Sequence, residues 1–100
     1  MRNILSRIPE KYSQDIKLAI KILKTEGCTE IYLFGSLAEG DFREDSDIDL
    51  AVKGCPRDRF FCILGKLLLE LNHKVDLINL DGRDPFAEYL LSEGELINVS

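Results

Sequence analysis

Two stretches of the chain repeat their apolar residues at three- and four-residue spacing, which is the period of a helix with one buried face. The first begins at Ser13, a candidate N-cap, and ends before Gly27, a candidate stop. The second covers residues 57–71 and continues through Gly65. A shorter pattern of the same kind covers residues 85–92. The spacing therefore predicts two long helices and a short one near the C-terminal end.

Between these helices lie short runs rich in β-branched and aromatic residues, which are typical of strands. The run "EIYLF" (30–34) has apolar residues on both faces, so we expect a strand that is covered on both sides. The runs "DIDLAV" (47–52) and "KVDLINL" (74–80) predict two further strands, each followed by a turn signal. A last extended piece is expected over "ELINV" (95–99). Helices that alternate with strands in this order indicate a layered α/β domain.

Size and composition fit one domain. The 100 residues are 45% hydrophobic, which suits a single buried core, so residues 1–100 are expected to form one domain. No run approaches the roughly 18 apolar residues of a membrane span, and we expect a cytoplasmic protein. The cysteines Cys28, Cys55 and Cys62 form no Cys-x-x-Cys pair. This spacing favours reduced thiols over a disulfide or a zinc site.

The negative charge of the chain is concentrated in one window. The chain has 18 Asp and Glu against 13 Lys and Arg, and residues 39–49 contain six of these acids and one base. The whole formal charge of −5 therefore belongs to this window. A chain with this balance and no basic stripe is a poor candidate for direct nucleic-acid binding, because such binding requires Lys and Arg at the phosphates.

Gly35 and Ser36 directly follow the first predicted strand and precede "LAEG", which could open a short helix. A strand that runs into a glycine and a helix start presents free backbone N–H groups, and these attract phosphate. Glycine allows the phosphate to approach closely, and the Ser36 hydroxyl adds one donor. Gly35 and Ser36 are therefore candidates for nucleotide binding, the alternative being a tight turn capped by Ser36.

Asp47 and Asp49 lie two residues apart on a predicted strand, so their side chains point to the same face, roughly 6.5 Å apart along the chain. Two carboxylates this close repel each other by about 4 kcal/mol at an effective dielectric of about 20. A divalent cation relieves this repulsion, and Mg²⁺ typically takes one or two protein carboxylates and completes its shell with water and substrate phosphates. The alternative is a solvated acidic loop.

A third carboxylate, Asp76, lies in the middle of the apolar run "VDLINL", where a lone Asp is costly unless it is paired or binds a metal. Its alternative is an edge position that faces water. Asp81 competes for the same role but belongs to a turn with Gly82. His73 has no visible partner, so we expect a surface or capping residue. Three carboxylates beside a phosphate site predict two-metal phosphoryl or nucleotidyl transfer.

The spacing of these residues resembles a known signature. Gly35-Ser36, ten intervening residues and then Asp47-x-Asp49, within "FGSLAEGDFREDSDIDLAV" (34–52), resemble the motif of the nucleotidyltransferase superfamily of DNA polymerase β type. The resemblance is closer to its minimal, single-domain branch, the MNT proteins. It covers nearly the whole chain, because "VDLINL" and the ending "PFAEYLLSEGELI" (85–97) are also similar to that branch.

This resemblance implies a mixed sheet with helices packed against it, the polymerase β-like nucleotidyltransferase core. It implies transfer of a nucleoside monophosphate from ATP or another nucleoside triphosphate to an acceptor hydroxyl, with release of pyrophosphate. Gly35 and Ser36 would hold the terminal phosphates, and Asp47 and Asp49 would bind two Mg²⁺ ions. Asp76 would complete one metal site and help to activate the acceptor.

The resemblance also implies a partner. Minimal members of the superfamily commonly pair with a HEPN-domain protein, an RNase toxin to which the transferase attaches AMP. We therefore expect a hetero-oligomer in which this chain is the antitoxin and its catalytic and metal-binding residues are Asp47, Asp49 and Asp76.

The chain departs from the family pattern at the phosphate site. Family members often have a basic residue two or four positions after the glycine, whereas this chain has Leu37 and Glu39 there, and Arg43 is the only base nearby. Two alternatives therefore stay open. One is a non-catalytic binding module that neutralises a partner by contact, with its acidic window mimicking nucleic acid. The other is the catalytic subunit of a transferase for a small hydroxylated molecule, such as an aminoglycoside-like compound.

Overall fold

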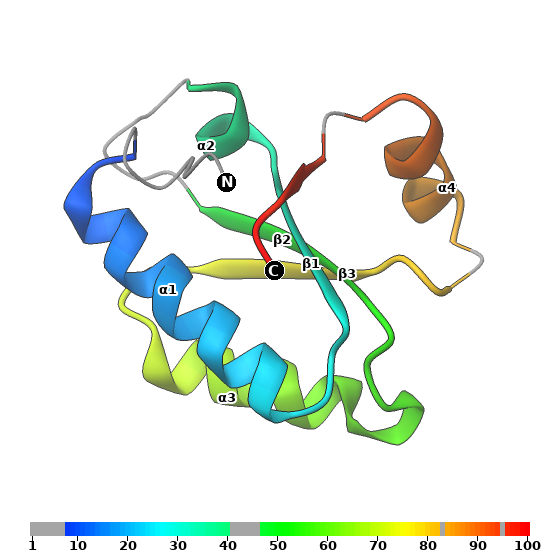
Figure 1. Cartoon of the computed structure of the whole chain (residues 1–100), viewed down its shortest axis with the longest axis horizontal. Coiled ribbons are helices and arrows are strands. Elements are labelled where there is room, and N and C mark those ends of the chain that lie inside the picture. Colours follow the sequence, from blue (N-terminus) through cyan, green and yellow to red (C-terminus); the bar gives the residue numbers. More distant parts are fainter. Residues whose placement is uncertain (1–7, 41–46, 83, 95) are drawn as a thin grey trace.

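The strands form a mixed sheet, shown in Figure 1. The computed structural model describes residues 8–40, 47–82, 84–94 and 96–100, and in these ranges the sheet has four strands in the order β3-β2-β1-β4. Strand β1 (Glu30–Phe34) pairs antiparallel with β2 (Ile48–Lys53) and with the short β4 (Ile97–Asn98). Strand β3 (Val75–Asn79) pairs parallel with β2. The sheet confirms the predicted α/β class with a mixed sheet.

The predicted helices are confirmed, and the ends of the two long ones are shifted. They are α1 (Glu10–Thr25), α2 (Ser36–Glu39), α3 (Phe60–Glu70, after a 3₁₀ turn at Arg57–Arg59) and α4 (Pro85–Ser92). The prediction that Ser13 caps the first helix is wrong, because α1 begins at Glu10 with Pro9 as its N-cap. Ser13 lies inside the helix, where its hydroxyl donates to the Glu10 carbonyl at 3.1 Å. None of the helices in the described ranges is long and apolar enough to cross a membrane.

One face of the sheet packs against α1 and α3, which lie together on that side in Figure 1. Side chains alternate along a strand, so every second residue of β1, β2 and β3 enters this core. The fully buried side chains there include Ile16, Leu23, Ile31, Leu33, Ile48, Leu50, Ile63 and Leu67. This larger core holds the sheet rigid beneath its other face.

The other face of the sheet is covered by α4. Phe34 and Ala51 from the strands and Leu80, which follows β3, form a smaller cluster with two residues of α4, Ala87 and Leu90. This second cluster explains the apolar residues on both faces of "EIYLF", so the expectation of a strand covered on both sides is confirmed. Because the side chains of a strand alternate, the acidic residues of β2 and β3 lie on the same face as this cluster.

Ion pairs join the C-terminal end of α1 to the 3₁₀ turn before α3 and to the middle of α3. The Glu26 carboxylate lies 2.6 Å from Arg59 Nη2 and 2.6 Å from Lys66 Nζ. The hydrogen bond from Lys66, followed by that from Arg59, lowers the pKa of Glu26 to about 2.

The expectation of three reduced thiols is wrong for two of them, because Cys28 and Cys55 form a disulfide. Cys28 precedes β1 and Cys55 follows β2, and the antiparallel register that places Glu30 opposite Lys53 brings the two flanks together. This pairing depends on a register between segments 27 residues apart, which the spacing of the cysteines does not reveal. Cys62 is free and exposed.

Candidate active site

The site begins at the glycine after β1. Gly35 has φ 76° and is the N-cap of α2, so it occupies the left-handed region that favours glycine. A Cβ atom at Gly35 would lie 2.1 Å from Asp49 Oδ2. This contact arises because Phe34, the last residue of β1, lies opposite Asp49 in the antiparallel ladder. The two halves of the sequence motif therefore meet in the structure at a position where only glycine fits.

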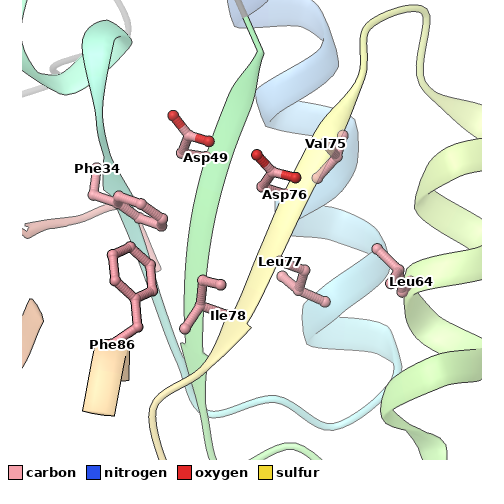
Figure 2. Close-up of a pocket in the computed structure, with 8 residues that line it drawn as sticks. All are labelled: Phe34, Asp49, Leu64, Val75, Asp76, Leu77, Ile78 and Phe86. Carbon is pink, nitrogen blue, oxygen red and sulfur yellow. The ribbon is translucent and has the colours of Figure 1, made fainter. Parts of the chain in front are cut away.

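Asp49 and Asp76 lie side by side on neighbouring strands, as Figure 2 shows. They are register partners in the parallel β2–β3 ladder. The pKa of the Asp49 carboxyl is raised to about 6, chiefly by burial and further by the charge of Asp76, a hydrogen bond with Asp76 and the charge of Asp47. The pair could hold a hard divalent cation, which prefers carboxylate oxygens and removes their repulsion.

Asp47 lies directly before β2 and is partly buried. Its charge raises the pKa of Asp49, so the first and second aspartates interact as the sequence pattern predicts. In the described part of the chain, however, no three His, Cys, Asp or Glu side chains are arranged so that they could hold a metal ion together. The structure thus brings Asp49 and Asp76 together and leaves Asp47 beside them, outside a closed set of three ligands.

Two neighbouring cavities lie at the site, and the first of them adjoins the aspartates. The first has a volume of about 270 Å³ and is lined by Asp49 and Asp76 together with Phe34 and Phe86. The second, of about 370 Å³, lies between α2 and α4 and shares Phe34 and Phe86 with the first. Gly35 lines the second cavity, so the two cavities run from the glycine to the carboxylates. The sequence pattern did not single out Phe86, which approaches the site only because α4 packs on this face of the sheet.

The expected departure from the family pattern is visible in the structure. Leu37 is buried in the large core, and Glu39 is exposed and lines the second cavity. Among the described residues, no Lys or Arg lines either cavity. Arg43, the only base near the motif in the sequence, lies outside the described residues. The described walls of the site therefore carry negative charge and no compensating base.

Asp76, the third acid, lies on an edge strand and faces water, which is the alternative that the sequence left open for it. Asp76 is exposed on β3, which within the described residues has a neighbouring strand only on its β2 side. This exposure does not remove Asp76 from the site, because Asp49 is its direct neighbour. Its competitor Asp81 lies beyond the far end of β3, where its carboxylate accepts a hydrogen bond from the Gly54 N–H at 2.7 Å. Asp81 therefore has a structural role in joining two loops.

The prediction for His73 is wrong. His73 is partly buried, and its Nδ1 atom lies 2.7 Å from Oδ2 of Asp15, a buried residue of α1. The sequence did contain a signal for this pair, because Asp15 falls on the same helix face as Tyr12, Ile16 and Ala19, all of which are buried. A carboxylate inside an apolar stripe requires a polar partner from another element.

Solved structures resemble this chain over most of its length. A toxin–antitoxin structure with AMP-PNP has a TM-score of 0.63 and 28% identity, and the match covers 82% of this chain and 70% of that one. A minimal nucleotidyltransferase has a TM-score of 0.65 and 27% identity, covering 86% of this chain and 92% of that one. The tri-AMPylated Shewanella oneidensis HEPN toxin in complex with MNT antitoxin gives a TM-score of 0.57 and 25% identity, with coverages of 86% and 70%.

No curated protein matches the chain by sequence. The family model described as polymerase beta, nucleotidyltransferase matches residues 15–99. That range contains every strand of the sheet, the glycine–serine turn and all three aspartates. The chain therefore belongs to the polymerase β-type nucleotidyltransferase family.

Proposed function

We propose that this protein is a Mg²⁺-dependent nucleotidyltransferase that moves AMP from ATP to a hydroxyl group of a partner protein, and that it is the antitoxin of a HEPN toxin. The observation that carries the proposal is the convergence of Gly35, Asp49 and Asp76 at one point of the sheet. Family membership supports the reaction class. The similar structures solved with AMP-PNP and with an AMPylated HEPN toxin support the nucleotide and the partner.

In this proposal the nucleotide binds along the two cavities. Gly35 lets the backbone lie close against Asp49, since any Cβ there would clash with the Asp49 carboxylate, and its lack of a side chain allows the terminal phosphates to approach. The N–H groups at the start of α2 and the Ser36 hydroxyl donate to phosphate oxygens. The aromatic rings of Phe34 and Phe86 form the apolar wall of both cavities and exclude water from the reacting groups.

The three aspartates are the proposed ligands of two Mg²⁺ ions. The donor set fits this ion, because carboxylates that repel each other and have no base beside them are the ligands a hard cation prefers. Since the three side chains do not form a metal-holding group in this structure, the proposal requires one of them to turn toward the ions. Bound Mg²⁺ would neutralise phosphate charge and polarise the α-phosphate.

In this proposal Asp76 accepts the proton of the acceptor hydroxyl during the transfer. The acceptor hydroxyl oxygen attacks the α-phosphorus, a new P–O bond forms, and the bond from the α-phosphorus to the bridging oxygen breaks. The electron pair leaves with pyrophosphate. The hydroxyl proton passes to a carboxylate oxygen of Asp76, which is exposed on the edge strand and accessible to an acceptor.

A partner protein fits the composition of the site. The described residues around the cavities include no base, so a partner can supply the positive charge that a triphosphate needs. The proposed assembly is therefore a hetero-oligomer, located in the cytoplasm, where ATP is abundant. Related structures were solved as MntA–HepT and MNT–HEPN complexes.

Labelled ATP tests the transfer directly. The purified chain is incubated with Mg²⁺, ATP labelled at the α-phosphate and the protein encoded beside it, and label on that protein is the expected result. Asp49→Asn and Asp76→Asn should each reduce the transfer at least about 100-fold, because each removes a carboxylate ligand of the proposed Mg²⁺ ions. Glu70→Gln, an exposed acid on α3, is the matched control and should transfer normally. Transfer that survives Asp49→Asn at full rate would contradict the proposed role of the site.

A second function is favoured by Glu39 and by the lack of a base in the described walls of the cavities. It is neutralisation of the partner by contact, without catalysis. The double variant Asp47→Asn with Asp49→Asn separates the two functions. If the variant still forms the complex but no longer neutralises the partner, contact alone is insufficient. If it neutralises as well as the unmodified chain, the contact function replaces the catalytic one.

A further inference from the structure

A buried carboxylate on α1 holds the segment that leads into β3. Asp15 is only 3% exposed, and its Oδ2 atom accepts three hydrogen bonds. The donors are the backbone N–H of Asn72 at 2.8 Å, the backbone N–H of His73 at 2.9 Å and the His73 ring at Nδ1, 2.7 Å away. A buried carboxylate without partners would be strongly destabilising, so this arrangement satisfies Asp15 and fixes two consecutive residues of the loop.

The same short segment is fastened to the sheet. Lys74, the residue after His73, accepts a hydrogen bond at its carbonyl from the Ile48 N–H at 2.9 Å. Ile48 is the first residue of β2. The His73 ring also packs against Tyr12 of α1, with ring centroids 4.4 Å apart. The chain between α3 and β3 is therefore held on one side by α1 and on the other by the start of β2.

This fastening lies just before an acid of the candidate site. Asp76 follows Lys74 by two residues and is placed opposite Asp49 by the register that Ile48 and Val75 begin. A shift of one residue in that register would turn Asp76 to the opposite face of the sheet. Since β3 has one neighbouring strand in the part of the chain that the structure describes, the contacts that precede it are well placed to fix where it starts.

We propose that Asp15 and His73 are positioning residues of the active site, which hold the start of β3 so that the carboxylate of Asp76 stays beside that of Asp49. This proposal deepens the proposed function. It rests on that function only in what the Asp15–His73 pair is for, which is to keep two metal-binding carboxylates together. Asp15 of α1 and His73 of the loop bond to each other and not to the carboxylates of the site. Their effect on the site passes through the backbone of residues 72–76.

Two variants of His73 test the side-chain bond while the backbone bonds remain. His73→Ala removes the Nδ1 donor and the ring contact with Tyr12. His73→Asn restores a donor N–H at about the position of Nδ1. The matched control is Glu26→Gln, which weakens the ion pairs that join α1 to the 3₁₀ turn and the middle of α3. This control separates a general loss of α1 packing from a specific effect on β3, and Asp15→Ala is a harsher variant to add if it folds.

The first readout is Mn²⁺ affinity, measured by calorimetry on the full chain well below the melting temperature of each variant. His73→Ala should weaken Mn²⁺ binding about tenfold, as loss of a group that orients a metal ligand does. His73→Asn should recover most of the affinity. Glu26→Gln should leave the affinity within about twofold, because residues that share no partners act independently.

The second readout is amide hydrogen exchange, which needs no metal. In His73→Ala the Ile48 amide, which bonds to Lys74, should exchange about tenfold faster through local opening. The Thr29 amide, which bonds to Lys53 at the far end of the β1–β2 ladder, should keep its rate.

The two readouts distinguish failure of the positioning role from failure of the metal-dependent function. If His73→Ala lowers the melting temperature as Glu26→Gln does and leaves both Mn²⁺ affinity and Ile48 exchange unchanged, the pair is only structural and the proposal is overturned. If the unmodified chain binds no Mn²⁺, the metal-dependent function fails, and exchange at Ile48 still decides whether the pair positions β3. Unchanged Ile48 exchange would then overturn the positioning role by itself.

Discussion

At the scale of single residues, the closest link between the two halves of the motif is the contact of Gly35 with Asp49. Two separate features require glycine at this position. Its φ is positive, and a Cβ there would lie 2.1 Å from Asp49 Oδ2. Gly40 has a similar φ of 83°, but a Cβ atom there would have no other atom within 4 Å. The two glycines share a positive φ but differ in ψ, which is −155° at Gly35 and 10° at Gly40, so Gly40 controls for the positive φ alone.

Gly35→Ala and Gly40→Ala should differ in both stability and binding. Gly40→Ala should lower the free energy of unfolding by about 1 kcal/mol, the cost of a left-handed residue with a side chain. Gly35→Ala should cost roughly 1–3 kcal/mol more, because its methyl group displaces Asp49. Chemical denaturation measures both values. Nucleotide binding should be lost in Gly35→Ala and retained in Gly40→Ala, and equal behaviour of the two variants would contradict the contact.

The raised pKa of Asp49 predicts a pH dependence of stability. The pKa is about 6 in the folded protein against an ordinary value of 3.8, so between these values the folded state binds more protons than the unfolded state. The free energy of unfolding through this group should therefore fall as the pH rises from about 4 to 6 and stay low above that. The Glu26 shift acts below its ordinary value of 4.5, largely outside this window.

Thermal melts in EDTA between pH 4.5 and 7 measure this effect. The melting temperature should decrease with rising pH in the unmodified chain, and Asp49→Asn should remove most of the decrease. Millimolar Mg²⁺ should raise the melting temperature mainly at the high end of the range, because the ion binds the ionised carboxylates of the folded state. A melting temperature that rises with pH across this window in EDTA would contradict the assigned environment of Asp49.

At the scale of elements, the local sequence pattern predicted the helices and strands. It did not predict contacts between segments that are distant in the chain. The strand "EIYLF" and the last helix at residues 85–92 were placed at their observed bounds. The position of Asp76 beside Asp49 follows from the parallel pairing of β2 with β3, which the family resemblance implied only as a mixed sheet. The disulfide and the Asp15–His73 pair were missed because each joins segments far apart in the chain.

The disulfide predicts a dependence of stability on redox state. Closing the 27-residue separation between Cys28 and Cys55 restricts the unfolded chain, which by chain entropy stabilises the fold by roughly 3–4 kcal/mol. Dithiothreitol or the double variant Cys28→Ser with Cys55→Ser should therefore lower the free energy of unfolding by up to this amount. Cys62→Ser is the control and should change little, since Cys62 is exposed and free. Equal stability with and without reductant would argue against the bond.

At the scale of the whole molecule, the charge of the chain and the composition of its site agree. The formal charge of −5 arises in residues 39–49, and the described walls of the two cavities carry acids and no base. The sequence predicted this departure at Leu37 and Glu39. Which face each residue occupies required the structure, because Leu37 is buried in the core and Glu39 lines the cavity beside Gly35.

Restoring a base at Glu39 should therefore improve nucleotide binding. Glu39→Arg changes the charge beside Gly35 and should tighten the binding of Mg²⁺–ATP about two- to fivefold, the range expected for an exposed ion pair. Glu70→Arg changes the net charge equally on α3 and should have a smaller effect at the same ionic strength. Titration calorimetry measures both variants. If they gain equally, the effect reflects net charge and the missing base at the site is unimportant.

The most direct measurement is a crystal structure with Mn²⁺ and a non-hydrolysable ATP analogue. The account predicts anomalous peaks for Mn²⁺ in contact with carboxylate oxygens of Asp47, Asp49 and Asp76, and terminal phosphates against the backbone at Gly35 and Ser36. Mn²⁺ bound elsewhere, or a triphosphate that avoids Gly35 at saturating concentration, would contradict it.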